Sequence, residues 1–347
     1  MSRIAWLPPR FMASRMKLSL LAALPLLALA GARPSARSSS IAYVDVSVTT
    51  VWTDPSKVRP VDGPALSNPV RIQQWLDTMT VDDFRDLTNS GRTQTQALYG
   101  TPVEILGYQD GWYEVAVSGQ PTPKNAYGYP GWIPAVQVSF DDRFGALQSS
   151  KPFAAVDKVA NTTLYRDVWL TEKCIDVAYD TRLPVIGVFG EAVQVAVPGG
   201  GSAYIRIFDV SIYDSVKHIP YPTGEDLIRS AKLFLGRPYL WGGTSGYAFD
   251  CSGFTHTLYD AHGITVPRDA DAQADFTGHG SPVDRADLQL GDLLFYADNT
   301  SDPSTIYHVA MYAGDGNMVE AYDSGTPIRV TPVRFNEDYW GAERFLH

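Results

Sequence analysis

Short β-type runs separated by turn residues dominate the middle of this 347-residue chain. From Thr93 onward, segments rich in Val, Ile, Trp and Tyr alternate with Gly, Pro and Asp. These segments include residues 97–99, 103–106, 112–117 and 131–134. Short strands at such spacing are typical of a small barrel. The sequence therefore predicts a small β-barrel in this region.

The pattern then recurs about 65 to 80 residues later, which is the length of one small domain. The first copy contains residues 98–100, 103–105, 112–115 and 131–133, and the second contains 164–166, 183–185, 192–195 and 203–205. The two copies resemble a tandem of bacterial SH3-type barrels, which we place at 93–150 and 151–217. The preceding segment, 44–92, carries one helical patch, and we expect it to be an N-terminal extension that packs on the first barrel.

The N-terminus has the pattern of a cleaved leader. Arg15 and Lys17 precede an apolar run over residues 18–30, and the small residues Gly31 and Ala32 follow it. These are the charged, apolar and cleavage regions of a signal peptide. The run is short for a membrane span. We therefore predict a signal peptide over 1–32 and a secreted or periplasmic protein with no membrane span.

The charge of the chain is strongly uneven. Residues 1–40 contain six basic residues and no acidic one, so the remainder has 22 Lys and Arg against 38 Asp and Glu, a net charge of −16. A body this acidic lacks a surface that neutralises phosphates, which argues against a nucleic-acid partner. No cluster of His, Asp and Glu has metal-ligand spacing, so we predict neither a metal nor a cofactor. We expect a monomer.

The C-terminal part, 222–347, is expected to be a separate α+β domain that carries the chemistry. Asp250 is a good N-cap for a helix in which Phe254, Leu258 and Ala261 share one face. Cys251 would then be the first helical residue, where the N–H groups and the helix dipole favour a thiolate nucleophile. A buried, inert cysteine is the alternative. We predict that Cys174 is free, because a disulfide to Cys174 would abolish the nucleophile.

A predicted hairpin carries a candidate base. Residues 308–313 alternate as a half-buried strand, and Gly314-Asp315-Gly316 reads as a three-residue turn. That turn would pair Ala313 with Asn317 and place Glu320 on the same face as His308. A two-residue turn would instead place Glu320 on the opposite face. An imidazole oriented by an acidic group commonly supports a cysteine nucleophile.

Together these motifs resemble the NlpC/P60 cysteine peptidases, over essentially all of 222–347. The shared blocks are Trp241-Gly242-Gly243, Asp250-Cys251-Ser252-Gly253-Phe254, Pro267-Arg268, Gly291-Asp292-Leu293, His308-Val309-Ala310-Met311-Tyr312 and Glu320-Ala321. The resemblance implies a papain-like α+β domain that hydrolyses cell-wall peptides through a thioester. Glu320 departs from the family, which most often has His at this position, but a carboxylate can still accept the N–H of the imidazole.

The resemblance also implies roles for individual residues. Cys251 would be the nucleophile, His308 the base and then the acid, and Glu320 the group that orients His308. The Cys251 backbone N–H and the Tyr239 hydroxyl would stabilise the oxyanion, although Tyr239 could equally be a core aromatic. Asp250 and Ser252 would bind a free amine of the substrate, or Asp250 could act only as the N-cap.

Two SH3-type barrels before such a domain resemble the γ-D-glutamyl-L-diamino acid endopeptidases. This likeness implies murein stem peptides with a free N-terminal L-Ala, such as L-Ala-γ-D-Glu-L-Lys or its diaminopimelate form, as substrates. Tyr129 matches the barrel tyrosine that such enzymes use to recognise that end. The acidic partner of the amine has no sure match, because Gln94 or its neighbours occupy its region.

Three other interpretations stay open. The chain could be a non-catalytic wall-binding protein with the barrels as targeting modules, or an endopeptidase that acts on polymeric peptidoglycan. An acyltransferase or amidase of related fold is the third, although the chain has no basic patch that would face a membrane.

Overall fold

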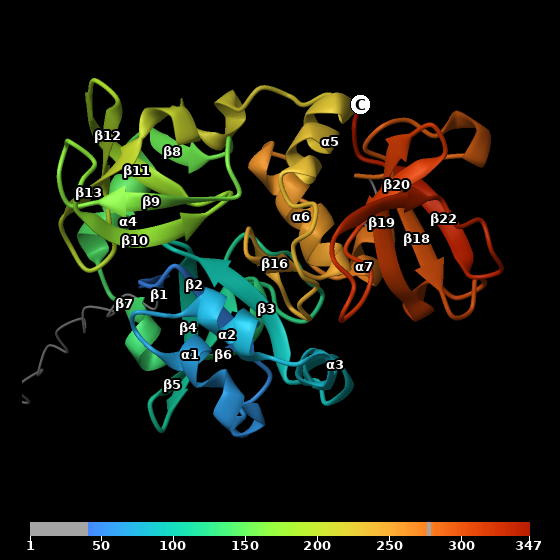
Figure 1. Cartoon of the computed structure of the whole chain (residues 1–347), viewed down its shortest axis with the longest axis horizontal. Coiled ribbons are helices and arrows are strands. Elements are labelled where there is room, and N and C mark those ends of the chain that lie inside the picture. The colour runs from blue at the N-terminus through green and yellow to red at the C-terminus, as the bar shows by residue number, and fades with distance from the viewer. Residues whose placement is uncertain (1–40, 276–278) are drawn as a thin grey trace, which may run out of the picture. The chain divides into compact units, whose positions relative to one another are not determined.

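The protein is described by a computed structural model that covers residues 41–275 and 279–347. The predicted signal peptide, 1–32, lies outside the described residues. Within the part of the chain that the structure covers, no helix combines the length and apolarity needed to cross a membrane. The described residues form two β-barrels followed by an α+β domain (Figure 1), so the predicted fold class is confirmed.

The first barrel is a seven-stranded sheet in the order β3-β2-β6-β5-β4-β1-β7. Its strands are β1 (Ile41–Val44), β2 (Val48–Trp52), β3 (Thr93–Leu98), β4 (Pro102–Gln109), β5 (Trp112–Val117), β6 (Tyr129–Pro134) and β7 (Val138–Ser139). Val51, Val103, Val115 and Ile133 fill its interior. The helix α4 (Asp142–Ser150) leads from this barrel to the second.

The first barrel begins earlier than the sequence predicted. Its strands β1 and β2 come from the segment 44–92 and the residues just before it, so this segment is not an extension outside the barrel. Every residue of β2 is buried, which removes the polar alternation that identifies a half-buried strand. The helices α1 (Gly63–Leu66), α2 (Ile72–Thr78) and α3 (Val81–Asn89) lie between β2 and β3, and α2 is the predicted helical patch.

The second barrel repeats the topology of the first, with the strand order β10-β9-β13-β12-β11-β8-β14. Its strands are β8 (Phe153–Val156), β9 (Asn161–Tyr165), β10 (Lys173–Ala178), β11 (Arg182–Phe189), β12 (Ala192–Ala196), β13 (Ser202–Arg206) and β14 (Val210–Tyr213). Of the four segment pairs in the predicted repeat, three lie on strands that occupy equivalent places in the two sheets. The match of Leu98 to Leu164 is wrong, because β9 takes the place of β2 rather than β3.

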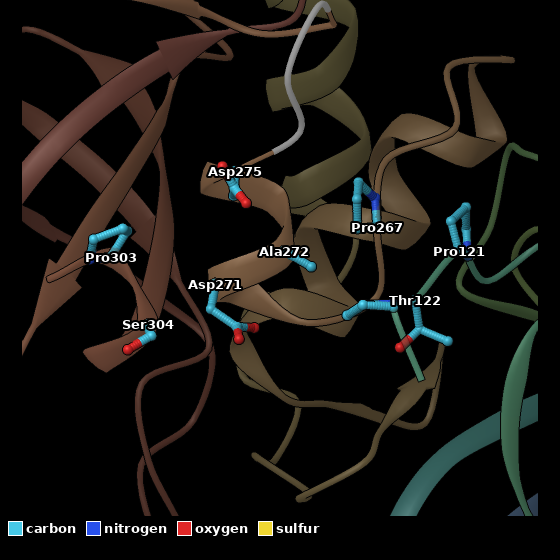
Figure 2. Close-up of a pocket in the computed structure, with 9 residues that line it drawn as sticks. Pro121, Thr122, Pro267, Asp271, Ala272, Asp275, Pro303 and Ser304 are labelled. Carbon is cyan, nitrogen blue, oxygen red and sulfur yellow. The ribbon is translucent and has the colours of Figure 1, made fainter. Parts of the chain in front are cut away.

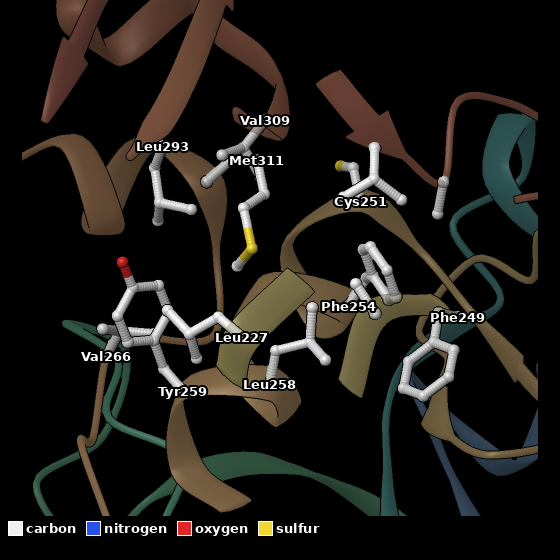
Figure 3. Packing of buried hydrophobic residues seen from close by; sticks show 14 of the residues in the cluster. Leu227, Phe249, Cys251, Phe254, Leu258, Tyr259, Val266, Leu293, Val309 and Met311 are labelled. Carbon is white, nitrogen blue, oxygen red and sulfur yellow. The ribbon is translucent and has the colours of Figure 1, made fainter. Parts of the chain in front are cut away.

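The C-terminal domain packs helices against one six-stranded sheet (Figure 1). The helices are α5 (Gly224–Lys232), α6 (Cys251–Ala261) and α7 (Ala270–Ala274). The sheet has the order β17-β22-β18-β19-β20-β21, from β17 (Ser281–Pro282), β18 (Leu293–Ala297), β19 (Ile306–Gly314), β20 (Asn317–Glu320), β21 (Arg329–Pro332) and β22 (Tyr339–Arg344). Phe254 and Leu258 of α6 share an apolar cluster with Val309 and Met311 of β19, and Cys251 belongs to the same cluster (Figure 3).

Strand β3 of the first barrel is hydrogen-bonded to the segment just before α6. The Gln96 Oε1 accepts bonds from the Thr244 backbone N–H at 3.2 Å and the Ser245 hydroxyl at 3.0 Å. The Thr93 hydroxyl donates to the Trp241 carbonyl at 2.7 Å. Residues 244–245 and 248–249 form the short hairpin of β15 (Thr244–Ser245) and β16 (Ala248–Phe249). The first barrel is therefore hydrogen-bonded directly to the segment that leads into α6.

Candidate active site

Cys251 is the first residue of α6, as predicted. The Asp250 side chain caps this helix, because its Oδ1 accepts the Gly253 backbone N–H at 2.7 Å. The Gly242 N–H donates to the other carboxylate oxygen at 2.8 Å. Only 6% of Cys251 is exposed. The thiol is thus placed at a helix start but in an enclosed position.

The protonation of the Cys251 thiol differs from the sequence expectation of a thiolate. Burial, followed by the negative charge of Asp250, raises the pKa of the thiol to about 12. Hydrogen bonds from the Val309 and Ser252 N–H groups oppose this rise without cancelling it. The free protein therefore holds a neutral thiol at pH 7. The bond from Val309 also places the sulfur beside the strand that carries His308.

His308 and Glu320 form a buried hydrogen-bonded pair. The His308 Nε2 lies 3.0 Å from the Glu320 Oε2, and 2% and 0% of the two residues are exposed. Burial lowers the pKa of His308 despite the bond to Glu320, so the imidazole is neutral at pH 7. An ionised carboxylate only accepts hydrogen bonds, so the Nε2 carries the proton and the Nδ1 keeps its lone pair.

The hairpin reaches the predicted face by a different register. Gly314, not Ala313, pairs with Asn317, so the turn contains only Asp315 and Gly316, with φ values of 51° and 71°. A two-residue turn alone would have turned Glu320 to the wrong face. A bulge between Tyr312 and Gly314 inserts one extra residue and restores the pairing of Met311 with Val319. Glu320 consequently shares a face with His308.

Two arginines that the sequence analysis missed hold Glu320. The Arg334 Nη1 lies 2.9 Å from the Glu320 Oε2, and the Arg329 Nη2 lies 3.2 Å from its Oε1. Burial by itself would raise the pKa of Glu320, but the bond to His308 and the charge of Arg334 outweigh it and lower the pKa. Arg329 faces Glu320 directly across β20 and β21. Pairing the segments of β20 and β21 would have placed Arg329 opposite Glu320, so the sequence contained a signal for Arg329. It contained no comparable signal for Arg334.

A cavity of about 750 Å³ brings the remaining predicted residues together. It is lined by Tyr129, Tyr239, Asp250, Cys251, Ser252 and His308, together with residues of the first barrel such as Gln94 and Lys124. Glu320 does not line it and lies behind His308. Burial and the nearby Cys251 and Asp250 raise the pKa of Tyr239 well above its ordinary value, so its hydroxyl keeps its proton. The cavity therefore brings a thiol, an imidazole and a phenol to one space.

Arg268 connects this cavity to the first barrel. Its guanidinium donates to both Asp250 carboxylate oxygens, at 2.6 Å and 3.0 Å. Only 1% of Arg268 is exposed to solvent. The same side chain donates to the Ser252 hydroxyl at 3.0 Å and to the Thr95 hydroxyl of β3 at 2.9 Å. Both oxygens of Asp250 are thus engaged within the protein. The sequence analysis quoted Arg268 as a family motif but gave it no role.

The predicted amine-binding tyrosine lies across the cavity. The Tyr129 hydroxyl donates to the Asp269 Oδ1 at 2.8 Å, and the Lys124 Nζ lies 2.9 Å from the Asp269 Oδ2. Gln94, in the region where the sequence offered no acid, donates to the Thr53 hydroxyl at 2.8 Å. Asp269, on the peptidase side, is thus the carboxylate that Tyr129 contacts.

A second hollow, of about 430 Å³, adjoins the cavity and shares Asp271 with it. Figure 2 shows it between Pro121 and Thr122 of the first barrel, Pro267, and Pro303. Four prolines, Pro121, Pro123, Pro267 and Pro303, give it an apolar wall.

Other predictions about the site concern cysteine and metal. Cys174 is free and exposed on β10, as predicted. Among residues 41–275 and 279–347, no group of His, Cys, Asp and Glu could hold a metal ion.

Comparison with known proteins agrees with this geometry. Residues 236–346 match the model of the NlpC/P60 family, and residues 158–213 match the YKFC SH3b2 domain. A protein of Bacillus cereus (strain ATCC 10987 / NRS 248) named gamma-D-glutamyl-L-lysine dipeptidyl-peptidase is 42% identical over 313 residues, which are 89% of this chain and 92% of the relative. The chain belongs to the NlpC/P60 family.

Two further likenesses cover the same NlpC/P60 architecture. A Bacillus subtilis (strain 168) protein with the same name is 36% identical over 288 residues, which are 82% of this chain and 90% of the relative. The crystal structure of an NlpC/P60 family protein from Bacillus cereus ATCC 10987 superposes with a TM-score of 0.83 at 41% identity, covering 88% of this chain and 100% of that one. The likeness therefore includes both barrels, and the chain is a peptidase.

Replacing Arg268 should destabilise the NlpC/P60 domain strongly. Arg268→Met leaves the buried Asp250 carboxylate without its cation, and we expect a loss of about 3–5 kcal/mol of unfolding free energy. The matched control is Arg229→Met, because Arg229 forms an exposed pair with Asp226 at 2.8 Å and should lose at most about 1 kcal/mol. Urea unfolding followed by tryptophan fluorescence measures both. Equal losses in the two variants would contradict the assignment of Arg268.

Proposed function

We propose that this chain is a secreted or periplasmic cysteine peptidase that hydrolyses the γ-D-Glu–L-diamino acid bond of murein stem peptides with a free N-terminal L-Ala. One observation carries the proposal. Cys251 and His308 line a cavity whose other wall belongs to the first barrel, and Glu320 is hydrogen-bonded to His308 from outside that cavity. The names of the Bacillus relatives, which share the barrels and the catalytic domain, support this substrate class.

The first half of the reaction forms a thioester. The Nδ1 of His308 takes the thiol proton while the Cys251 sulfur attacks the γ-carbonyl carbon of D-Glu. The Cys251 N–H at the start of α6 and the Tyr239 hydroxyl stabilise the oxyanion of the tetrahedral intermediate. His308 then donates its proton to the leaving amine of the diamino acid. Glu320, held by Arg334 and Arg329, stabilises the transient imidazolium.

The second half of the reaction releases the dipeptide. His308 removes a proton from water, and the resulting hydroxide attacks the thioester carbon. The intermediate collapses, the C–S bond breaks, and the proton returns from His308 to the Cys251 sulfur. The products are L-Ala-γ-D-Glu and a peptide that begins with the diamino acid. Because thiol and imidazole both start neutral, the proton transfer accompanies the attack rather than preceding it.

The first barrel supports the choice of a short, amine-terminated peptide. Lys124, Tyr129 and Gln94 of this barrel line one side of the cavity, which is the side where a polymer would have to continue beyond L-Ala. The cavity is lined by one chain, so a monomer suffices. An endopeptidase for polymeric peptidoglycan would need this side open, and a non-catalytic wall-binding protein would need no buried His308–Glu320 pair.

The substrate proposal predicts a strict difference between two peptides. The wild type should cleave L-Ala-γ-D-Glu-L-Lys, and Cys251→Ala should lose this activity, while Cys174→Ala serves as the control with wild-type activity. N-acetylation removes the ammonium, and we expect kcat/KM to fall at least about 100-fold. Mass spectrometry of the products measures cleavage of the free peptide by the wild type and the two variants, and cleavage of the acetylated peptide by the wild type. Equal cleavage of the acetylated peptide would support a wall endopeptidase, and cleavage of neither would support the binding protein.

The His308–Glu320 pair predicts the acid limb of the pH profile. Because the base acts when neutral and burial lowers the pKa of His308, kcat/KM should rise through an apparent pKa below 6.5. Glu320 raises the pKa of His308, so Glu320→Gln should move this limb to still lower pH and reduce kcat at least about tenfold. The exposed Glu337→Gln is the matched control. A limb that moves to higher pH in Glu320→Gln would contradict the assigned role.

A further inference from the structure

An ammonium group of the protein already occupies the place where the substrate amine is expected. Lys124 lies in the loop between β5 and β6 of the first barrel. Its Nζ donates to the Tyr129 hydroxyl, lies 2.9 Å from the Asp269 Oδ2, and stands 4.4 Å from the centroid of the Tyr129 ring. All three residues line the cavity that contains Cys251.

The surroundings of the Lys124 Nζ suit any primary ammonium. A carboxylate supplies an opposite charge, a hydroxyl oxygen supplies an acceptor, and an aromatic ring supplies a face for a cation. Tyr129 is only 2% exposed, and its hydroxyl also donates to Asp269 at 2.8 Å, so the two acceptors are held together. The site therefore combines the buried Tyr129 with Asp269, whose side chain is 26% exposed, whereas its occupant comes from a loop.

Lys124 is able to leave this site. Its side chain is 46% exposed, and its flexible stem can carry the charge into water. Exposed ion pairs contribute little to stability, so breaking the pair with Asp269 has a small cost. Arg268 differs from Lys124 in this respect, because its ion pair with Asp250 is buried and water cannot replace it.

We infer that Lys124 fills the ammonium subsite of Tyr129 and Asp269 in the free enzyme and that the N-terminal ammonium of the substrate displaces it. This inference rests on the proposed function. Lys124 already uses the Tyr129 hydroxyl, the Tyr129 ring and the Asp269 Oδ2, and two ammonium groups at one such place repel each other. Lys124 therefore competes with a substrate that has a free amine. Lys124 is thus a specificity-determining residue that sets the apparent affinity for that end of the peptide.

The test removes the competing ammonium. In Lys124→Met, KM for L-Ala-γ-D-Glu-L-Lys should fall about three- to fivefold, the factor an exposed ion pair represents, with kcat within about twofold of wild type. The inhibition constant of L-alaninamide, a small primary ammonium, should fall by the same factor. Lys124→Arg keeps a cation in the loop and should not show the fall. Lys158→Met, which removes an exposed lysine of the second barrel, is the matched control.

The outcomes separate this inference from the proposed function. An unchanged or higher KM for Lys124→Met, in an enzyme whose wild type cleaves the free-amine peptide, overturns the inference and leaves the function standing. A higher KM would mean that Lys124 instead binds a carboxylate of the substrate. Failure of the wild type to cleave that peptide overturns the proposed function and the inference together.

Discussion

The buried ion pair of Arg268 and Asp250 is the interaction on which the catalytic region depends. Asp250 caps the helix that begins with Cys251, and Arg268 neutralises the carboxylate that the cap requires. Because Arg268 also donates to Thr95 of the first barrel, one guanidinium joins the start of α6 to a separate domain. The barrel therefore has a fixed position beside the thiol, and its residues can serve as one wall of the cavity.

Charge is distributed so that the reacting groups begin neutral. The carboxylate beside Cys251 and the enclosure of the thiol favour the protonated sulfur, and burial favours the neutral imidazole. The negative charge that would stabilise an imidazolium is on Glu320, which is hydrogen-bonded to His308, and two arginines pair with it. In most resembling enzymes a histidine takes this position. In this chain Glu320 is paired with Arg329 and Arg334, which explains how a fully buried carboxylate is tolerated.

Local patterns predicted much of this arrangement. The cap at Asp250, the helix after Cys251 and the strand of His308 follow from spacing within short segments, and the barrel repeat follows from recurring strands. Strand β2 was missed because all its residues are buried. The bulge that restores the register of Glu320 has no clear local signature. Arg334 meets Glu320, and Lys124 meets Asp269, only through the tertiary fold, which the spacing of residues in one sequence does not encode.

The central claim is that Cys251 forms a thioester with the amine-terminated dipeptide. The direct measurement is the mass of the protein after rapid mixing with an L-Ala-γ-D-Glu ester that has a good leaving group, which makes release of the acyl group slow relative to its formation. The account predicts a burst of leaving group and an L-Ala-γ-D-Glu adduct on the peptide that contains Cys251. A full catalytic turnover without a burst or adduct, or an adduct on Cys174, would contradict it.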